Sequence, residues 1–435
     1  MDVTMLNGTS SNSPRRPWMA TAIWGWRLEI VLTLATFFIL VVSARVVAFG
    51  PLLVILAGLT VLQKRPDVRM RLLHHVRTNR DHRWLQAAFW HCAIIGRDGT
   101  TPSVVRSASL PVGSRYLLKL PIGLHAELLQ KSALELASAL GVREVRVNAS
   151  PVNTKYVELV VIRKSAFPKV LASPLVQCHE VSLWEPLFLG IGNDGLAVSV
   201  TLPEHNLLIG GEPGSGKSVA LSTIVAAAAL DPTVRLTLLD GKHVELVAWC
   251  DIANEFVGAD QESAVAALEG LRDQMDLRYE TLAATRRRKM TRDDLEGLHL
   301  LVIDELAFYL RGGEKAMRDR FSELLRDLVS RGRAAGIIVV ATTQKPSHEI
   351  VPTWIRDLFS FRLAMRCTSS DASDTILGQG WASQGYSAAT IDPSMRGVGY
   401  LLAEGGVPGL VMTPFLDDDD IEVIEAAAYE LRHVL

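Results

Sequence analysis

The segment that most constrains the fold is Gly211-Glu212-Pro213-Gly214-Ser215-Gly216-Lys217-Ser218, which has the spacing of a Walker A loop. It follows the apolar stretch Leu207–Gly210 and precedes the helical run Val219–Leu230, as a phosphate-binding loop requires. Its glycines let backbone N–H groups turn toward phosphate oxygens, while Lys217 supplies a positive charge and Ser218 a hydroxyl for Mg²⁺. These eight residues are therefore predicted to bind ATP.

From this loop onward, short apolar segments alternate with helical ones. The apolar segments are Leu207–Gly210, Leu236–Asp240, Leu298–Ile303, Ile337–Thr342 and Phe359–Ala364. Such alternation is typical of a mostly parallel sheet covered by helices, so an α/β fold is predicted. Before it, strands expected at 115–121, 144–147 and 156–162 and a helix at 126–140 indicate a small α/β subdomain.

A second motif is the apolar run Leu298–Ile303 followed by Asp304 and Glu305. In P-loop NTPases an acid at this place holds Mg²⁺, so Asp304 and Ser218 are the predicted metal ligands. Glu305 follows where a general base can polarise the attacking water. Alternatively, Glu305 only caps the next helix and the protein binds nucleotide without hydrolysing it. An acidic pair after four apolar residues favours hydrolysis.

Two further polar positions lie beside the segment Ile337–Thr342. Gln344 follows it and is predicted to sense the terminal phosphate and to orient water. Arg331 and Arg333 precede it and can face the phosphates of a neighbouring subunit. A basic helix end, stabilised by the helix dipole, explains these two arginines equally well.

The beginning of the chain has a different character. Hydrophobic residues make up 49% of the chain and charged residues only 21%, more apolar than an ordinary soluble enzyme. The apolar excess lies in residues 21–62, interrupted near the middle by Arg45. A charge at mid-bilayer costs roughly 3 kcal/mol, which a turn at Arg45 avoids. We therefore predict a two-helix transmembrane hairpin, rather than one long tilted helix or a cleavable signal peptide.

Basic residues flank this predicted hairpin on both sides. They are Arg15 and Arg16 before it, and Lys64, Arg65, Arg69, Arg71, Arg77, Arg80 and Arg83 after it. The positive-inside rule then places both ends of the hairpin, and the α/β domain that follows it, in the cytoplasm, as a multi-pass protein of the cell membrane. The stretch 64–83 can also bind anionic lipid or DNA, although a juxtamembrane anchor is the preferred interpretation.

Charge and cysteine content exclude little else. A net charge of -2 does not exclude a nucleic-acid partner, because only a local basic surface is needed to displace counterions from phosphates. The densest basic run of the region with the predicted parallel sheet is Arg286–Lys289, and such a run is more often a solvated face than a DNA contact. The 4 cysteines have no CxxC spacing, so neither a metal site nor a disulfide framework is predicted.

Five segments in this order resemble the FtsK/SpoIIIE motor family of the HerA class. They are Gly214–Val219, Val302–Ala307, Arg333–Ile337, Ala341–Ser347 and Asp374–Gly378. The resemblance runs from about Leu117 to Leu402 and so includes the small α/β subdomain.

The resemblance implies a RecA-like P-loop motor domain in a ring homo-oligomer, expected to be a hexamer, with double-stranded DNA in its channel and ATP between subunits. Five residues match the nucleotide-handling positions of the family: Lys217, Ser218, Asp304, Glu305 and Gln344. Arg333 is the candidate for the cation that acts on the neighbouring subunit, with Arg331, Arg362 and Arg366 as rivals.

Three features depart from the family pattern. Asp240-Gly241-Lys242 replaces the usual Asp-Pro-Lys, the predicted membrane part has two spans rather than four, and only one helix is expected after Leu416, which leaves no room for a winged-helix module. This layout is similar to conjugative-transfer proteins of actinobacterial plasmids and integrative elements. We therefore predict a membrane-anchored DNA translocase for conjugation rather than chromosome segregation, with transfer or division machinery as partner.

Two other functions stay open: a secretion-system ATPase that moves protein, and a nucleotide-gated membrane scaffold. The predicted division of the chain is a disordered cytoplasmic tail at 1–20, the transmembrane hairpin at 21–63, a basic linker at 64–100, the small subdomain at 101–190, the motor at 191–416 and a C-terminal helix at 417–435.

Overall fold

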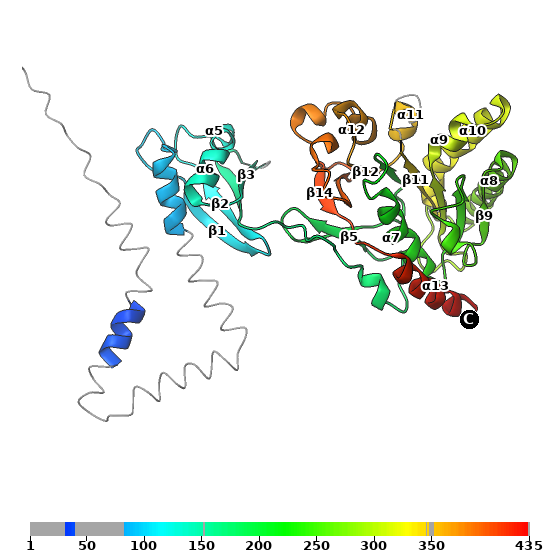
Figure 1. Ribbon diagram of the computed structural model, residues 1–435, viewed down its shortest axis with the longest axis horizontal. Coiled ribbons are helices and arrows are strands. Elements are labelled where there is room, and N and C mark those ends of the chain that lie inside the picture. The colour runs from blue at the N-terminus through cyan, green and yellow to red at the C-terminus, as the bar shows by residue number, and fades with distance from the viewer. Residues whose placement is uncertain (1–30, 40–81, 151–152, 345, 348–351, 434–435) are drawn as a thin grey trace, which may run out of the picture. The chain divides into compact units, whose positions relative to one another are not determined.

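The computed structural model describes residues 31–39, 82–150, 153–344, 346–347 and 352–433 (Figure 1). By its internal contacts the chain divides into two compact units, at Lys164 and Ser165. The predicted tail at 1–20 and nearly all of the predicted hairpin at 21–63 lie outside the described residues. Residues 31–39 form a helix, and no helix within the described ranges is both long enough and apolar enough to span a membrane.

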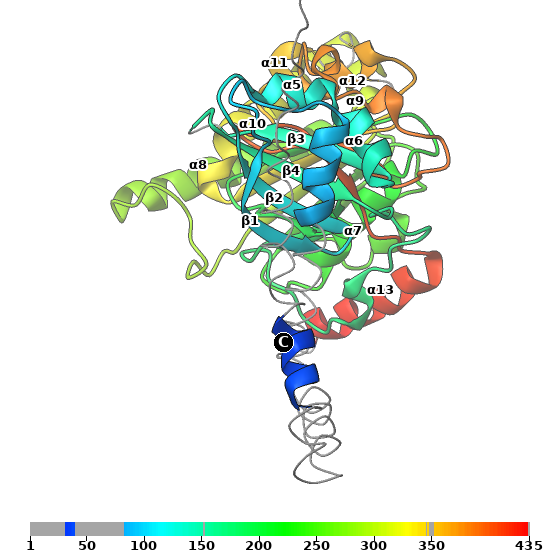
Figure 2. The same ribbon diagram turned by 90° about the vertical axis from the view of Figure 1, so that its left-hand side faces the viewer.

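The first unit is built on a four-stranded antiparallel sheet with the strand order β1-β2-β4-β3. Its strands are β1 Ser103–Leu110, β2 Gly113–Lys119, β3 Glu144–Ala149 and β4 Tyr156–Ile162, and its helices include α5 Ala126–Lys131 and α6 Ala133–Leu140. Alternate strand residues such as Leu118, Val147 and Leu159 are buried together with Leu129 and Leu136 of the helices. One face of the sheet therefore carries the core. Figure 2 shows the four strands together with α5 and α6.

Three details of this unit differ from the prediction. A helix over residues 82–91 buries Leu85 and Phe89 in the same core, so the later part of the expected linker at 64–100 is folded. The helix expected at 126–140 breaks at Ser132, which ends α5 and precedes α6. Strand β1 was not predicted, because its apolar and polar residues do not alternate regularly along the segment.

The second unit contains a ten-stranded sheet with the order β6-β5-β14-β13-β12-β7-β11-β10-β8-β9. Its strands are β5 Leu187–Gly192, β6 Ala197–Val200, β7 Leu207–Gly210, β8 Arg235–Asp240, β9 Glu255–Val257, β10 His299–Asp304, β11 Ile337–Thr343, β12 Phe361–Met365, β13 Val398–Leu402 and β14 Gly409–Met412. The strands from β12 to β9 run parallel, which confirms the mostly parallel α/β sheet. Strand β5 pairs with β14, so the large unit begins earlier than the expected 191.

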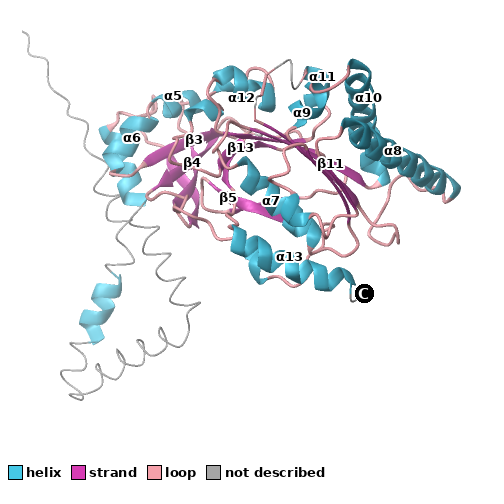
Figure 3. Cartoon of the chain, turned by 45° about the vertical axis from the view of Figure 1, so that its right-hand side comes forward, coloured by secondary structure: helices cyan, strands magenta, loops and turns pink. Residues whose placement is uncertain are grey.

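Helices cover both faces of this sheet (Figure 3). Leu300 and Val302 pack on the face covered by α7 Lys217–Ala229 and α13 Asp418–His433. Leu301 and Ile303, which alternate with them, pack on the opposite face. The helices of that face are α8 Gln261–Ala284, α9 Leu306–Arg311, α10 Lys315–Arg331, α11 Thr353–Arg356 and α12 Ser370–Leu377. Strands buried on both faces explain why these segments read as continuous apolar runs.

The C-terminal end of α7 is held by an arginine from α13. The Arg432 guanidinium donates to the carbonyl oxygens of Ala228, Ala229 and Asp231 at 2.7–2.8 Å. The Ala228 and Ala229 carbonyls belong to the last turn of α7, where no N–H four residues further on continues the helix, and a cation there also complements the helix dipole. We expect Arg432→Met to lower the free energy of unfolding by about 2 kcal/mol, measured by urea denaturation, since hydrogen bonds from a charged donor are lost.

The matched control for this change is Arg288→Met, because Arg288 is exposed. It should leave the unfolding midpoint nearly unchanged, since exposed substitutions usually have small effects. Equal stability losses in the two variants would contradict a capping role for Arg432.

His299 at the start of β10 gives the fold a pH dependence. Its ring nitrogens lie 2.9 Å from Thr237 Oγ1 and 2.8 Å from Gln274 Oε1. Burial, with Arg278 and Arg235 nearby, lowers the pKa of His299 to about 3. The folded state thus holds a neutral ring, whereas the unfolded chain binds a proton below about pH 6.5. The stability that this ring contributes is present above that pH and is lost as the pH falls toward 3.

We therefore expect the free energy of unfolding to fall by about 1.4 kcal/mol between pH 7.5 and pH 5.5 through His299 alone. His299→Asn cannot take up this proton, so the variant should lack that part of the acid-dependent loss, whatever its stability at neutral pH. Identical pH slopes for the two proteins in urea denaturation would contradict this assignment.

Candidate functional site

The strand order brings the two predicted nucleotide motifs to one edge of the sheet. β11 lies between β7, which leads into the Walker A loop, and β10, which ends in Asp304. The register pairs Thr343 with Gly210 and Asp304 with Asp240, so four neighbouring parallel strands end together. In open α/β sheets, ligands bind outside the carboxyl ends of the strands.

The Walker A loop is held by close backbone contacts. Gly211 N donates to Thr343 O at 3.2 Å, and Gly397 N, before β13, donates to Ser215 O at 3.0 Å. Gly216 has φ 102°, and a Cβ there would lie 2.5 Å from Gly397 N. Glycine at 216 is therefore required both by its backbone conformation and by the close approach of a second chain segment.

Lys217 begins α7 and is only 5% exposed. Burial lowers the pKa of Lys217, while the nearby carboxylates of Asp304 and Glu305 oppose that shift. A cation at the first residue of a helix adds to the positive end of the helix dipole, and α7 also presents its free N–H groups there. This end of α7 is therefore suited to an anion such as a polyphosphate.

Asp304 has one carboxylate oxygen without a partner. Thr342 Oγ1 donates to Asp304 Oδ1 at 2.9 Å, whereas Oδ2 is buried and accepts no hydrogen bond from the described residues. Burial raises the pKa of Asp304. A buried unpaired oxygen needs an explanation, and a metal ion supplies one. Mg²⁺ is commonly held by one or two protein oxygens together with substrate phosphates, so Asp304 and Ser218 fit this ion.

Glu305 adopts the left-handed backbone conformation, with φ 62°, and stands at the N-cap of α9. Its side chain makes no capping hydrogen bond, which does not favour the interpretation of Glu305 as a simple helix cap. Its carboxylate instead accepts from Thr343 Oγ1 at 3.1 Å, from Gln344 N at 3.2 Å and from Lys242 Nζ at 3.4 Å. The backbone of Gln344 is thus part of this cluster.

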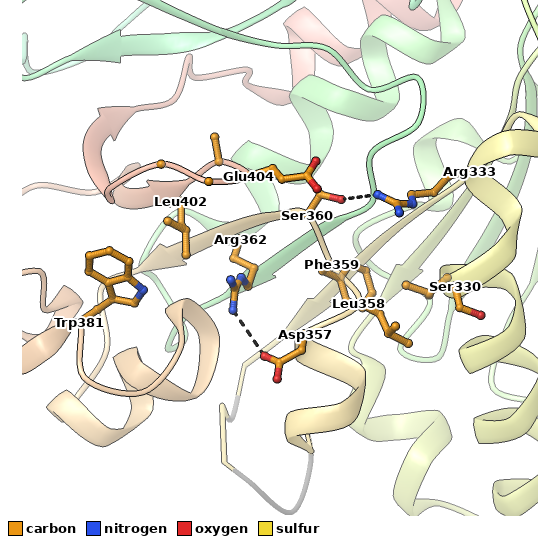
Figure 4. Close-up of a pocket in the computed structure, with 14 residues that line it drawn as sticks. Ser330, Arg333, Asp357, Leu358, Phe359, Ser360, Arg362, Trp381, Leu402 and Glu404 are labelled. Carbon is orange, nitrogen blue, oxygen red and sulfur yellow. Dashed lines mark hydrogen bonds and ion pairs between the residues drawn. The ribbon is translucent and has the colours of Figure 1, made fainter. Parts of the chain in front are cut away.

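Arg333 lies away from these residues. It is in the 3-10 turn Gly332–Ala335 before β11, and its Nη1 donates to Ser360 Oγ at 3.1 Å and to the Glu204 carbonyl at 3.4 Å. With Arg362 it lines a pocket of about 420 Å³ (Figure 4). The length of β11, about 20 Å, separates this edge from the Walker A edge, so Arg333 cannot contact phosphates bound in its own chain.

The rival arginines have intramolecular partners. Arg331 forms ion pairs with Asp276 and Asp327 and covers the ring of Tyr279. Arg362 Nη1 lies 3.8 Å from Asp357 Oδ1, within the distance of an ion pair. Arg366 forms an ion pair with Glu212, so it lies beside the Walker A loop of the same chain.

Sequence reasoning assigned no role to several residues of this edge: Lys242, Thr342, Thr343 and Gly397. The only signal for Lys242 was the unusual Asp-Gly-Lys sequence. A Cβ at Gly241 would lie 2.5 Å from Phe308 Cδ1, so glycine lets this loop pass close to α9.

Two members of the basic run 286–289 have acidic partners, since Arg287 forms an ion pair with Asp294 and Lys289 forms one with Glu204.

Comparison with known proteins agrees with this geometry. Residues 183–382 match the model of the FtsK/SpoIIIE family. The DNA translocase FtsK of Streptococcus pyogenes serotype M3 (strain SSI-1) is 25% identical over 353 residues, 75% of this chain and 42% of that protein. That of Haemophilus influenzae (strain ATCC 51907 / DSM 11121 / KW20 / Rd) is 28% identical over 314 residues, 62% of this chain and 58% of that protein.

Among solved structures, the pCW3 conjugation coupling protein TcpA, in its monomer form with ATPγS, is similar with a TM-score of 0.55 and 19% identity. The similarity covers 81% of this chain and 99% of that one. The chain spans less than half the length of the streptococcal relatives that it matches. These findings confirm the predicted family resemblance, while the roles of the individual site residues stay predictions.

Proposed function

Because residues 183–382 match the model of the FtsK/SpoIIIE family, we propose that this protein is a P-loop ATPase that uses ATP hydrolysis to move double-stranded DNA. The observation that carries the proposal is the position of Lys217, Asp304 and Glu305 at one sheet edge, with Asp304 Oδ2 buried and unpaired within the described residues. The relatives named as DNA translocases support duplex DNA as the substrate.

The residues of the site then have distinct tasks. The N–H groups of the Walker A loop and Lys217 neutralise the phosphates, and Ser218 and Asp304 hold Mg²⁺. The metal, when bound, stabilises the charge that develops as the terminal phosphoryl group is transferred to water. Glu305 accepts the proton of that water, and Gln344 orients the water near the end of β11. Thr342 keeps the Asp304 carboxylate in place through its hydrogen bond to Oδ1.

Arg333 suits a role in a ring of identical subunits. Within the described residues, its guanidinium is bound only by neutral oxygens, and it lies at the sheet edge opposite to Lys217. A head-to-tail arrangement brings opposite edges of successive subunits together, and it forms a ring where the rotation from one subunit to the next closes. We propose that Arg333 faces the nucleotide of the next subunit in a hexamer of this kind.

The finer biological role is also a proposal. Residues 21–63 anchor the protein in the cell membrane as a hairpin, and the motor works in the cytoplasm. Conjugative transfer is preferred to chromosome segregation, because the chain is similar in fold to a conjugation coupling protein over 81% of its length. Components of a transfer machinery are then the expected partners, and a division apparatus is the alternative.

The test is ATP hydrolysis by the full chain in detergent, with and without duplex DNA. We expect duplex DNA to raise the rate several-fold, and the effect to weaken as salt rises, because phosphate contacts release counterions. Equal rates with and without DNA at every salt concentration would exclude the translocase. Stimulation by a protein substrate alone would favour a secretion ATPase, and ATP binding without turnover would favour the nucleotide-gated scaffold.

A further inference from the structure

Lys242 follows β8 and contacts the proposed general base. Its Nζ lies 3.4 Å from Glu305 Oε2. The buried carboxylate of Asp240 holds the loop that carries it, accepting from the backbone N–H of Lys242 at 3.1 Å and from those of Val244 and Leu246 at 2.9 Å. The backbone of Lys242 is thus fixed, while its side chain is 37% exposed and can change its partner.

Three donors hold the carboxylate of Glu305 in this arrangement: Thr343 Oγ1, the backbone N–H of Gln344 and Lys242 Nζ. Oε1 accepts from Thr343 Oγ1 and Gln344 N, and Oε2 accepts from Gln344 N and Lys242 Nζ. A carboxylate offers roughly four lone-pair sites, two on each oxygen. The N–H of Gln344 is shared between both oxygens, so Lys242 Nζ is the only side-chain donor on Oε2 among the described residues, and its departure frees this oxygen for the attacking water.

The contact with Lys242 is the one that can be released most easily. Thr343 is fully buried at the end of β11, and the donor of Gln344 is a backbone N–H, so both are fixed by the strand. Lys242 follows Asp240, which is in register with Asp304 where β8 and β10 end, so Lys242 lies at the same sheet edge as the Walker A loop and Lys217. An anion beside Lys217 therefore attracts Lys242 as well.

We propose that Lys242 is a second phosphate-binding cation, which moves from Glu305 to the terminal phosphate when a nucleoside triphosphate binds. Oε2 of Glu305 is then free to accept a hydrogen bond from the attacking water while a triphosphate is present. A diphosphate lacks the terminal phosphate and leaves the Lys242–Glu305 pair intact. The inference rests on the proposed ATPase function and assigns a residue to the recognition of its substrate.

The test measures the affinity of the full chain for two probes, each with Mg²⁺: the triphosphate analogue adenylyl imidodiphosphate and the diphosphate ADP. The proteins compared are the parent, Lys242→Met, Glu305→Gln and the double variant, which form a double-mutant cycle. Lys242→Met should weaken binding of the triphosphate analogue by about tenfold and leave ADP binding unchanged. Glu305→Gln releases Lys242 and should tighten binding of the analogue. In the double variant the tighter binding should disappear, because Glu305→Gln tightens binding only by releasing Lys242, and that lysine is then absent.

Glu245→Gln is the matched control. The charge of Glu245 also acts on Lys217, but no hydrogen bond joins Glu245 to Lys242 within the described part of the chain. Its effect on affinity should therefore be the same with and without Lys242. Unchanged ADP binding shows that the Lys242→Met protein is folded. If the Lys242→Met protein misfolds, Lys242→Gln serves as the second variant.

Several results would overturn the inference. These are an additive double variant, equal losses of affinity for both probes, or a Glu305→Gln gain that survives without Lys242. By contrast, a parent protein that binds neither probe would overturn the proposed ATPase function itself, so the two failures can be told apart.

Discussion

Replacing Glu305 with glutamine is expected to lower the kcat for ATP hydrolysis by ~10²–10⁴-fold, the usual contribution of a general base. Glutamine keeps the length of the side chain and can still accept hydrogen bonds from Thr343 and Gln344 through its amide oxygen. It cannot take up the proton of the attacking water. Nucleotide binding should persist, because Lys217 and the loop N–H groups are unchanged, so the loss should appear in kcat in steady-state assays.

Glu314→Gln is the control for this variant. Glu314 stands before α10, is exposed and makes no capping hydrogen bond. Its replacement removes one carboxylate from the same unit and should leave the rate unchanged. A Glu305→Gln protein with the parent rate would mean that Glu305 is not the base.

Gly216→Ala is expected to lower kcat/KM by ~10²-fold or more, because small displacements of a catalytic loop have effects of this size. The new Cβ would lie 2.5 Å from Gly397 N and 2.6 Å from Gly397 Cα, where neither backbone can yield without moving β13 or the loop. The left-handed backbone at 216 adds strain for any side chain. Binding of a fluorescent nucleotide should weaken along with turnover.

Gly214→Ala separates these two causes. Gly214 also has a positive φ of 76°, but a Cβ there meets nothing within 4 Å among the described residues. Gly214→Ala should have the backbone strain of a side chain at positive φ without a clash with Gly397, and it should lose much less activity than Gly216→Ala. Similar losses in both variants would show that backbone strain alone, and not the contact with Gly397, decides the effect.

The parallel strands around the nucleotide edge were predictable because they are buried on both faces. β7 has the predicted bounds, Leu207–Gly210, and β10 is shifted by only one residue. The antiparallel strands β5, β6, β13 and β14 were not predicted. They are short, and their alternation of apolar and polar residues is interrupted by glycines such as Gly190 and Gly399.

The site itself was predictable only where one segment supplies the chemistry. The Walker A loop and the Asp304–Glu305 pair are contiguous, so sequence spacing was enough to find them. Lys242 and Thr343 reach Glu305 because β8 and β11 flank β10, which depends on strand order and not on distance along the chain. Arg333 was preferred to its three rival arginines only on the family resemblance, and the partners of the four arginines in the structure now distinguish them.

The position of Arg333, one strand length away from Lys217, also bears on how activity is controlled. If each nucleotide needs the loop of one copy and the guanidinium of another, a solitary copy has only half of the required charges. The rate of ATP hydrolysis per subunit then depends on the fraction of subunits that have assembled, and dilution alone abolishes the activity. Concentration at the site of assembly thereby becomes a regulator, without any additional ligand.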